Sequence, residues 1–485
     1  MNGRSVCPIL LFAAFCLGSV ALAADRPNII LMLADDQGWD GLSLEMAPGV
    51  AGSRGTIYHT PHAARLAAEG MRFSNAYAPA PVCSPTRISL QTGRSPAALH
   101  WTKAAPAEEG HRLLEPRLVK QIADGETTIG EVLKAAGYAT AHYGKWHISG
   151  GGPGRHGYDE HDGDTGNENA FQFTDPNPVD IVGMADRTEA FMARSKRQGK
   201  PFFIQLSWNA LHAAENASKA TLAKYDRQLG DAGSKRTAIA AITEDLDSGV
   251  GRILAAIDRL DLAGTTYVIY TSDNGAGGGG GKGGGKSGGR GAGLSGGKGS
   301  VWEGGVRVPF IIRGPGIAAN SWCHEPIVGY DLFPTFCEWA RVPRTAWPQA
   351  LEGGSITQLV ANVGQGRVTR PREGIAFHFP HYQSGNTPHS AIRIGNLKLI
   401  KMYEDESFRL FDLDADISER NDLAASRSAD ASRLRTHLER YLVAVDAQIP
   451  VPNPQFAPSQ PAVVSGKGDK GGAKKKDSKK KKGAA

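Results

Sequence analysis

Short apolar segments that end in polar residues constrain the fold of this chain more than any other feature. Segments of this kind are typical of strands buried on both faces, whose sheet has to be covered by helices on either side. The clearest examples, each with the polar residues that follow it, are 29–33 before Asp35 and Asp36, 138–143 before Lys145 and His147, 202–206 before His212, and 267–270 before Asp273 and Asn274.

Helical patterns lie between these segments. They cover 63–69, 129–136 and 238–260, and in the last of them apolar residues recur at spacings of three and four. Strands that alternate with helices predict an α/β fold. Because ligands in such folds bind beyond the carboxyl ends of the strands, we expect the polar residues after the four segments to meet at one site.

From about residue 370 the pattern changes. Two segments, 391–402 and 408–413, are expected to form strands of a small antiparallel sheet, and 429–445 is expected to be a helix. The Pro-rich and then Lys-rich end is expected to be disordered. The sequence thus predicts a main domain, a C-terminal α+β subdomain and a disordered tail, which cover 24–369, 370–450 and 451–485.

The first residues have the pattern of a secretory signal peptide. Arg4 supplies the positive charge, 9–17 the apolar region, and 21–23 a cleavage site of small residues. A membrane anchor is the alternative, but 6–24 is barely long enough and runs into the cleavage site. We expect a signal peptide over 1–23, no transmembrane segment, and export to a periplasm, to a lumen or out of the cell.

The cysteines left after export are odd in number. Cys7 and Cys16 leave with the signal peptide, and Cys83, Cys323 and Cys337 remain. In an oxidising compartment this means either one free thiol or one cysteine with a special role. Cys323 and Cys337 could pair, and the sequence alone leaves that question open.

The net charge of +6 belongs to the tail. Nine Lys and two Asp lie between 467 and 482, a contribution of +7, so the rest of the chain carries −1. The body therefore gives no reason to expect a nucleic-acid partner. The tail either holds polyanions or a cell surface by charge, or is simply solvated.

A glycine-rich segment interrupts the main domain. Residues 275–299 include 16 Gly among 25, too few side chains to build a core. Within it, 280–287 matches the phosphate-loop pattern G-x-x-x-x-G-K-S. No helical pattern follows, and such matches arise easily in a Gly/Lys tract, so we discard it.

The strongest local motif is Cys83-Ser84-Pro85-Thr86-Arg87. Pro85 suits the first turn of a helix and Gly93 suits its end, which puts Cys83 at a helix N-terminus. Free N–H groups and the helix dipole favour an anion there, and Arg87 can reach back from one turn further on. The alternative is a buried structural cysteine beside a surface arginine.

Taken together, these motifs resemble the signature of the type I, formylglycine-dependent sulfatases of the alkaline-phosphatase superfamily. Cys-x-Pro-x-Arg, followed by Thr92-Gly93, matches their central motif. The family's other motifs follow in order over 25–450: 27–38 with Asp35 and Asp36, 144–147 with Lys145 and His147, 272–275 with Asp273 and Asn274, 298–309 with Lys298, and the structural landmarks 331–335 and 410–413.

The resemblance implies a fold and a cofactor. It implies a large mixed, mostly parallel sheet flanked by helices, with a smaller C-terminal domain that contains an antiparallel sheet. It also implies that a separate maturation enzyme converts Cys83 to formylglycine. The implied metal ligands are hard oxygen donors that suit calcium, with magnesium as the alternative: Asp35, Asp36, residue 83, Asp273 and Asn274.

The resemblance further implies a sulfuric ester hydrolase, similar to the arylsulfatases, with these catalytic residues. Arg87, Lys145 and Lys298 would stabilise charge on the sulfate oxygens. His212, or Lys298 beside it, would protonate the leaving oxygen, and His147 would take a proton from the second hydroxyl of the hydrated aldehyde. The family's Pro-His-x-Pro segment is Leu211-His212-Ala213-Ala214 here, which departs from the pattern.

The substrate prediction rests on the signal peptide and the C-terminal subdomain. An exported sulfatase suggests a sulfated carbohydrate. Four residues of that subdomain are expected to grip it at the pocket rim: His378, His381, His389 and Arg393. Two other functions stay open: a phosphatase or phosphodiesterase of the same superfamily, against which Cys83 argues, and a non-catalytic binder of sulfated polymers in which Cys83 stays a thiol.

Overall fold

The computed structural model describes residues 26–168, 173–212, 216–277 and 293–458. The predicted signal peptide, most of the glycine-rich segment and the Lys-rich end lie outside these ranges. Within them, no helix combines the length and apolar character needed to cross a membrane.

An eight-stranded sheet forms the centre of the main domain. β10, β1, β9, β5 and β6 are parallel, β11 is antiparallel to both of its neighbours, and β12 is parallel to β2. The sheet is thus mixed and mostly parallel, as expected. In spatial order its strands are β12 (Ser321–Cys323), β2 (Met71–Phe73), β11 (Phe310–Arg313), β10 (Thr266–Ser272), β1 (Asn28–Ala34), β9 (Phe202–Ser207), β5 (Ala139–Gly144) and β6 (Glu160–His161).

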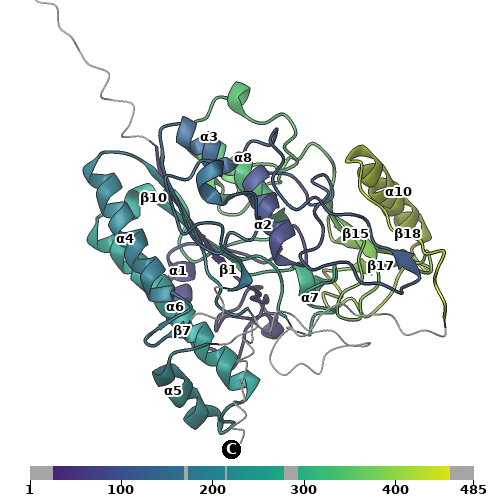
Figure 1. Cartoon of the computed structure of the whole chain (residues 1–485), viewed down its shortest axis with the longest axis horizontal. Coiled ribbons are helices and arrows are strands. Elements are labelled where there is room, and N and C mark those ends of the chain that lie inside the picture. Colours follow the sequence, from purple (N-terminus) through teal and green to yellow (C-terminus); the bar gives the residue numbers. More distant parts are fainter. Residues whose placement is uncertain (1–25, 169–172, 213–215, 278–292, 459–485) are drawn as a thin grey trace, which may run out of the picture.

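Alternate residues of β1 explain why both faces of the sheet are covered. Ile30 and Met32 belong to one hydrophobic core, whereas Ile29 and Leu31 belong to the other. Figure 1 shows the two helical layers on opposite sides of the sheet. The first layer contains α1 (Pro61–Ala68), α4 (Ile181–Arg197), α5 (Lys219–Leu229) and α6 (Lys235–Arg259), and the second contains α2 (Cys83–Thr92), α3 (Ile129–Ala135), α8 (Leu332–Trp339) and α9 (Thr357–Ala361).

Local signals set several helix ends. Thr128 and Glu131 form a capping box at the start of α3, where each side chain bonds the other's backbone N–H. Gly93 ends α2 with a φ of 68°, in the left-handed region where glycine costs least. The predicted helix after Cys83 is therefore confirmed at both ends.

The C-terminal subdomain is a four-stranded antiparallel sheet covered by one helix. One face packs on the main domain through Phe377 and Ile400, and the other packs on α10 through Leu399 and Leu438. This confirms the predicted α+β arrangement. Its elements are β14 (Ile375–Phe379), β15 (His389–Ile394), β16 (Leu397–Met402), β17 (Phe408–Asp412) and α10 (Ser428–Ala444).

Two details of this region differ from the sequence prediction. The expected strand over 391–402 is two strands, because Gly395 and Asn396 form the turn between β15 and β16, and β14 was not predicted. Disorder from 451 onward is wrong at its start, because β18 (Val451–Pro452) pairs with β4 (Leu113–Leu114). The remaining short elements are β3 (Ala76–Tyr77), β13 (Ile327–Val328), β7 (Phe173–Thr174), β8 (Asn177–Pro178), α7 (Glu303–Val306) and the 3₁₀ turns η1 (Ala51–Ser53), η2 (Pro153–His156), η4 (Ala263–Thr265), η5 (Gly329–Asp331) and η6 (Arg344–Ala346).

Candidate active site

The sheet brings the predicted strand-end residues together. β1 and β10 are parallel neighbours, in a register that places Asp35 beside Asp273. On the other side of β1, β9 and β5 run in the same direction, and the Lys145 N–H donates to Ser207 O at 2.7 Å. The four strands end at one edge of the sheet, as the sequence pattern predicted.

The turn after β1 is held against the end of β10. Asp36 has a φ of 60°, in the left-handed region that residues other than glycine rarely adopt. Its N–H donates to Asp273 Oδ1 at 3.1 Å, and Asn274 Nδ2 donates to Asp36 Oδ1 at 2.8 Å. These contacts gather the oxygen-bearing side chains of both turns in one place.

Three cations face the three carboxylates. Buried charges of this kind are stable only when they are paired. The three cations and three carboxylates cancel in formal charge, so a bound divalent cation would make the site positive. The pairs are Lys145 with Asp35 (Nζ–Oδ2 2.6 Å), Arg87 with Asp273 (Nη2–Oδ2 2.6 Å) and Lys298 with Asp36 (Nζ–Oδ1 2.7 Å).

Cys83 lies within this cluster as the first residue of α2. Its Sγ is 3.4 Å from Asp35 Oδ1 and 3.8 Å from Asp36 Oδ1, and only 2% of the residue is exposed. Burial, together with the charges of Asp273 and Asp35, raises the pKa of the thiol. The unmodified side chain is therefore a poor nucleophile, because the thiolate is the reactive form.

The two predicted histidines lie beside the cluster. A His212 nitrogen, Cys83 Sγ and an Asp35 oxygen all lie within 4.8 Å of one another. His147 interacts electrostatically with Lys145, Arg87 and His212. Among the described residues, the Nδ1 atoms of both histidines are buried without a hydrogen-bond partner, so each is available to a ligand or a proton.

Burial and the neighbouring cations keep both histidines neutral. They lower the pKa of His147 far below its usual range and that of His212 to about 3, and Lys145 contributes most of the charge effect in each case. Burial opposes the charges of Asp36 and Lys298, but their mutual attraction lowers the pKa of the carboxyl and raises that of the ammonium. Lys298 is therefore a fixed cation.

The donor set fits a hard divalent cation. Asp35, Asp36, Cys83 and Asp273 each offer one ligand atom, and these four atoms lie within 4.8 Å of one another. Asn274 Oδ1 is buried and has no hydrogen-bond partner in the part of the chain that the structure describes. Carboxylate and amide oxygens are the ligands that calcium and magnesium prefer, so an ion at this position would satisfy the orphaned oxygen.

The sequence did not reveal the support beneath the turns that follow β1 and β10. The Gln37 N–H donates to Ser272 Oγ at 2.9 Å, and Tyr270 OH donates to Gln37 Oε1 at 2.6 Å. Gln37 is buried and ties the turn after β1 to β10. The only available signal was the presence of hydroxyl residues inside an otherwise apolar segment.

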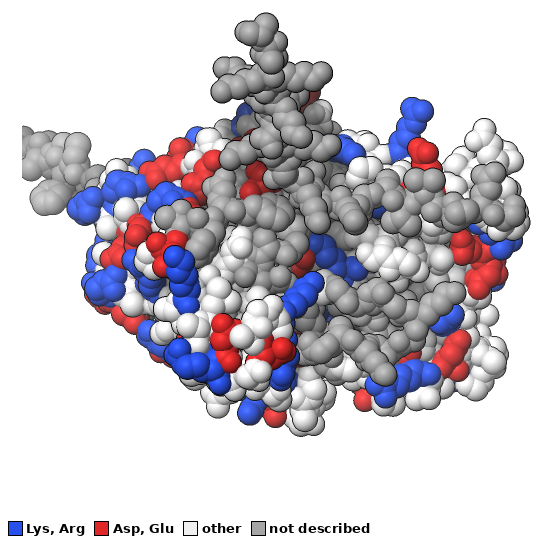
Figure 2. Space-filling view, turned by 60° about the horizontal axis from the view of Figure 1, so that its bottom comes forward, with Lys and Arg blue, Asp and Glu red and all other residues white. Residues whose placement is uncertain are grey.

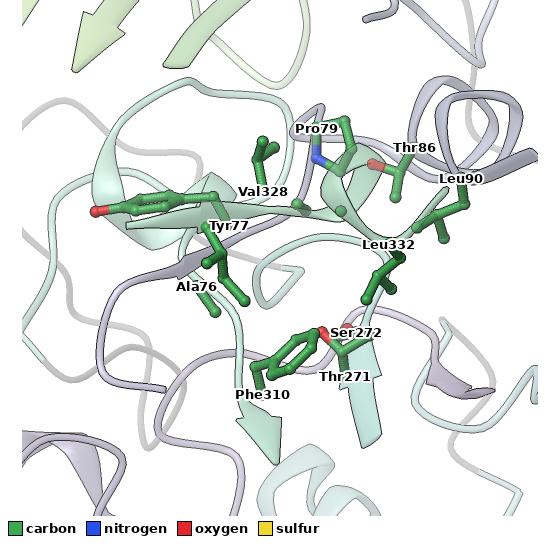
Figure 3. A pocket seen from close by; sticks show the side chains of 13 residues that line it. Ala76, Tyr77, Pro79, Thr86, Leu90, Thr271, Ser272, Phe310, Val328 and Leu332 are labelled. Atoms are coloured by element: carbon green, nitrogen blue, oxygen red, sulfur yellow. The ribbon is translucent and has the colours of Figure 1, made fainter. Parts of the chain in front are cut away.

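An apolar pocket lies next to the site without belonging to it. Figure 3 shows Phe310, Leu332, Val328 and Leu90 around it, with Thr86 and Ser272 as hydroxyl-bearing neighbours. It has no cationic lining residue among those described, so it cannot hold a sulfate group. On the face in Figure 2, basic and acidic side chains are interspersed among the described residues, with uncharged surface between them.

The prediction that four C-terminal residues line a carbohydrate rim is wrong. All four are buried, and His381 is fully so. In each histidine both ring nitrogens already bond protein groups, which leaves none for a sugar. The histidine partners are Ser390 and Gln448 O for His378, Thr102 and Glu115 for His381, and Val301 N and Thr387 O for His389.

Arg393 is also an internal residue. Its guanidinium donates to Gly395 O at 2.9 Å, to Asn75 Oδ1 at 3.1 Å and to Tyr77 OH. It joins β15 to the main domain. The sequence pattern suggested exposure because polar residues cluster here, and it could not show that these residues satisfy one another across the domain interface.

The remaining cysteines are not paired in the described structure. Cys323 ends β12 and Cys337 lies in α8, and both are buried free thiols, as Cys83 is. Burial raises the pKa of Cys323 and of Cys337 to about 12. Both are therefore inert core residues, and the pairing left open by the sequence does not form.

Comparison with known proteins agrees with this geometry. The family model described as "Sulfatase" matches residues 27–342, and that described as "N-sulphoglucosamine sulphohydrolase, C-terminal" matches 297–448. The solved structure of Ps i-CgsB superposes with a TM-score of 0.70 at 24% identity, covering 87% of this chain and 94% of that one. This likeness confirms the fold class.

Curated relatives are also sulfatases. N-acetylgalactosamine-6-sulfatase of Sus scrofa is 33% identical over 74% of this chain and 70% of its own length. Arylsulfatase A of Homo sapiens is 29% identical over 78% and 76%. Among N-acetylgalactosamine-6-sulfatases, the match spans as little as 62% of the relative, in the human protein. The chain belongs to the sulfatase family of the alkaline-phosphatase superfamily, a family of sulfuric ester hydrolases.

Proposed function

We propose that this chain hydrolyses a sulfate ester on a carbohydrate, with formylglycine made from Cys83 as nucleophile and calcium as cofactor. The observation that carries the proposal is the position of Cys83. It begins α2 within 3.8 Å of two acidic side chains and beside a buried cluster of three paired cations. No other arrangement of the described residues combines a modifiable side chain, hard oxygen ligands and fixed positive charge.

Calcium would be held by Asp35, Asp36, Asp273 and Asn274, together with residue 83. When bound, it would polarise a sulfate oxygen and favour ionisation of the hydrated aldehyde. The protein's own contribution is to hold the carboxylates in place. Arg87 and the Asp36 N–H both bond Asp273, so this ligand has little freedom to turn.

The aldehyde at position 83 would supply, as its hydrate, one hydroxyl that attacks sulfur and a second that allows sulfate to be released. A thiol with a raised pKa offers neither. The net reaction takes one sulfate ester and one water to an alcohol and sulfate, with one proton released. Its protons have to move through groups beside residue 83, and the two histidines with free Nδ1 atoms are the best placed.

The charged residues divide between fixed cations and proton carriers. Arg87, Lys145 and Lys298 stabilise the charge that develops on the sulfate oxygens. Lys298 holds its proton too strongly to be a good acid, because Asp36 raises the pKa of its ammonium. His212 is the better donor to the leaving oxygen, since an anionic ester raises the pKa of a nearby imidazole. His147 has a buried Nδ1 without a hydrogen-bond partner among the described residues, so it is placed to take a proton once the bound anion raises its pKa in the same way.

The substrate class is inferred from relatives. The relative from Sus scrofa is named for a sulfated amino sugar, and the C-terminal match is named for another. We infer a sulfated carbohydrate for this chain on that ground. The domain boundaries at 24–369 and 370–450, the signal peptide and the dependence on a maturation enzyme belong to the same proposal.

A mass spectrum of the tryptic peptide 73–87 tests the nucleophile directly, because it separates aldehyde from thiol. Protein made with a formylglycine-generating enzyme should carry the aldehyde and turn over an aryl sulfate, and protein made without it should do neither. A metal chelator should abolish turnover and calcium should restore it. A thiol at position 83 in active protein, or full turnover in excess chelator, contradicts the proposal. A matured protein that binds sulfated polymers without hydrolysing them would be a non-catalytic binder.

A further inference from the structure

Lys298 lies on a segment that has little structure of its own. It follows glycine-rich sequence and precedes α7, which has only four residues. Its N–H donates to Ala276 O at 3.0 Å, and the next N–H, of Gly299, donates to Pro81 O at 2.8 Å. These two bonds fix the backbone at Lys298 and Gly299. The position of the ammonium also depends on what holds the residues that follow.

The residues that follow Lys298 are held by a buried ion cluster. We call Tyr77, Glu303, Arg307, Lys398 and Glu419 the Glu303 cluster. Glu303 bonds Arg307 Nε at 2.6 Å and Lys398 Nζ at 2.8 Å, and Tyr77 OH donates to it at 2.8 Å. Lys398 also pairs with Glu419 at 2.9 Å, and Glu419 Oε2 accepts the Glu303 N–H at 2.7 Å. Glu303 and Lys398 are fully buried.

Three further contacts from the C-terminal subdomain reach the same segment. The Val301 N–H donates to His389 Nε2 at 2.9 Å, and Ser295 Oγ donates to Ser418 O at 2.7 Å. Gln383 packs on Gly299, where a Cβ would stand 3.2 Å from its Nε2. Contacts at 295, 299, 301 and 303 therefore bracket Lys298 on both sides.

Lys398 is central because it neutralises two carboxylates at once. Without it, Glu419 loses its ion-pair partner and Glu303 keeps Arg307 alone, which is a costly arrangement for two buried carboxylates that lie close together. A shift of β16 would break its pairing with β15 and β17, whereas α7 is a single turn without strand pairing, so we expect the α7 segment to move. Such a shift moves the backbone only five residues from Lys298.

We propose that Lys398 is a positioning residue for Lys298, so that the C-terminal subdomain contributes to turnover although its ion cluster does not reach the reacting atoms. This inference rests on the proposed function of Lys298 as a fixed cation. It assigns to the buried polar residues of β15 and β16 a role in place of the carbohydrate contact predicted from the sequence.

A double-mutant cycle tests the proposal on matured protein, with kcat and KM measured on 4-nitrophenyl sulfate and normalised to formylglycine content. Lys398→Met should lower kcat about tenfold, as expected when a catalytic group is displaced by a fraction of an ångström. Lys298→Ala should lower it on the order of a hundredfold. The double variant should be no slower than Lys298→Ala, because Lys398 acts only through Lys298. Glu303→Gln, which keeps the shape of the side chain, repeats the cycle if Lys398→Met fails to fold.

Arg370→Met is the matched control. Arg370 is a partly buried cation that bonds Asp331 and Pro326 O, and none of these bonds involves 293–307. It should lower the melting temperature and leave kcat unchanged. If the losses of Lys398→Met and Lys298→Ala multiply in the double variant, or if Lys398→Met keeps full kcat, the positioning role is refuted.

Hydrogen exchange supplies a readout independent of activity. Lys398→Met should lose protection over 293–307, and Arg370→Met should not. Unchanged protection in Lys398→Met overturns the inference. If the wild-type protein is matured and hydrolyses no sulfate ester, the proposed function fails instead, and the exchange data still decide whether Lys398 holds the segment.

Discussion

Two buried ion clusters both draw residues from the 293–307 segment, Lys298 in one and Glu303 with Arg307 in the other, and they differ in what they leave unpaired. Among the described residues, the active-site cluster keeps three atoms without a hydrogen-bond partner, Asn274 Oδ1, His147 Nδ1 and His212 Nδ1. In the Glu303 cluster, Glu419 Oε1 also lacks a hydrogen bond, but it forms an ion pair with Lys398 Nζ at 2.9 Å, and the other carboxylate contacts are hydrogen bonds of 2.6–2.8 Å. Unused bonding capacity is therefore greater in the active-site cluster, whereas the charges of the Glu303 cluster pair with one another and join the domains.

Each cluster also contains one residue held at a positive φ, Asp36 at 60° in the active-site cluster and Glu419 at 53° in the Glu303 cluster. Backbone strain therefore does not distinguish the two clusters. They are distinguished instead by their unused bonding capacity. Mutations should therefore separate the two by activity and by stability.

The largest expected effect is at residue 83. Cys83→Ala should abolish turnover and leave the melting temperature within a few degrees of wild type, because it removes one small buried side chain. Cys83→Ser should accept sulfate and fail to release it, since it has a single hydroxyl. Intact-mass spectrometry after exposure to substrate should show the trapped ester. Repeated turnover by the serine variant would contradict the aldehyde mechanism.

The second-largest effect is expected from removing the side chain of Asn274. Asn274→Ala takes away a candidate calcium ligand without breaking an ion pair, so calcium affinity and activity should fall together while the fold remains. We expect an affinity loss of roughly tenfold to a hundredfold, measured by calcium titration calorimetry. Asn28→Ala, a buried amide at the opposite end of β1, is the control and should leave calcium binding unchanged. Equal calcium affinity in Asn274→Ala and wild type would remove Asn274 from the ligand set.

Breaking the joining cluster should affect stability more than breaking the active site does. Lys398→Met leaves Glu419 without its ion-pair partner and Glu303 with Arg307 alone, and should lower the free energy of unfolding by about 3–5 kcal/mol. Cys83→Ala should lower it by about 1 kcal/mol. Denaturant unfolding of the two variants under identical calcium concentrations gives the comparison. Similar values for both would mean that the two clusters are not distinct in role.

A smaller effect is expected from pH. Burial raises the pKa of Glu419 to about 7, with Lys398 opposing the rise. Because the folded-state pKa lies above the usual value of 4.5 for a glutamate, the folded protein binds this proton more tightly. The stability from this group is present at low pH and is lost as pH rises from about 4.5 to 7. The melting temperature of the wild type should fall as the pH rises from 5 to 8, and Glu419→Gln should reduce this fall.

The smallest effect is on substrate preference. His381→Gln disturbs a buried bond to Glu115 and should lower stability, but it should change KM for a sulfated oligosaccharide and for an aryl sulfate by the same factor. The ratio of the two KM values is the measurement. A KM that rises for the oligosaccharide alone would indicate that His381 contributes to binding the carbohydrate.

The sequence predicted the sheet and the strand-end residues well, because both depend on local patterns. The apolar run at 29–33 and the motif at Cys83 carry their own signals, and β1 and α2 form where these signals lie. The predicted carbohydrate rim in the C-terminal subdomain failed because it depends on contacts between residues far apart in sequence. Whether His389 meets solvent or the Val301 N–H depends on how two domains pack, and no pattern near position 389 records that. The ligand orientation around Asp36 likewise depends on Asp273, far away in sequence.

The near-complete burial of Cys83 determines when this residue can be modified. With 2% of its surface exposed, this residue cannot enter the catalytic pocket of another enzyme once the domain has closed. Under the proposed mechanism, conversion to formylglycine has to happen on the nascent or still unfolded chain, in competition with folding itself. Rapid folding would lock molecules permanently in the thiol form. The yield of active protein would then be set by the relative speeds of two processes during biosynthesis, and incubating the finished protein with the maturation enzyme would not raise it.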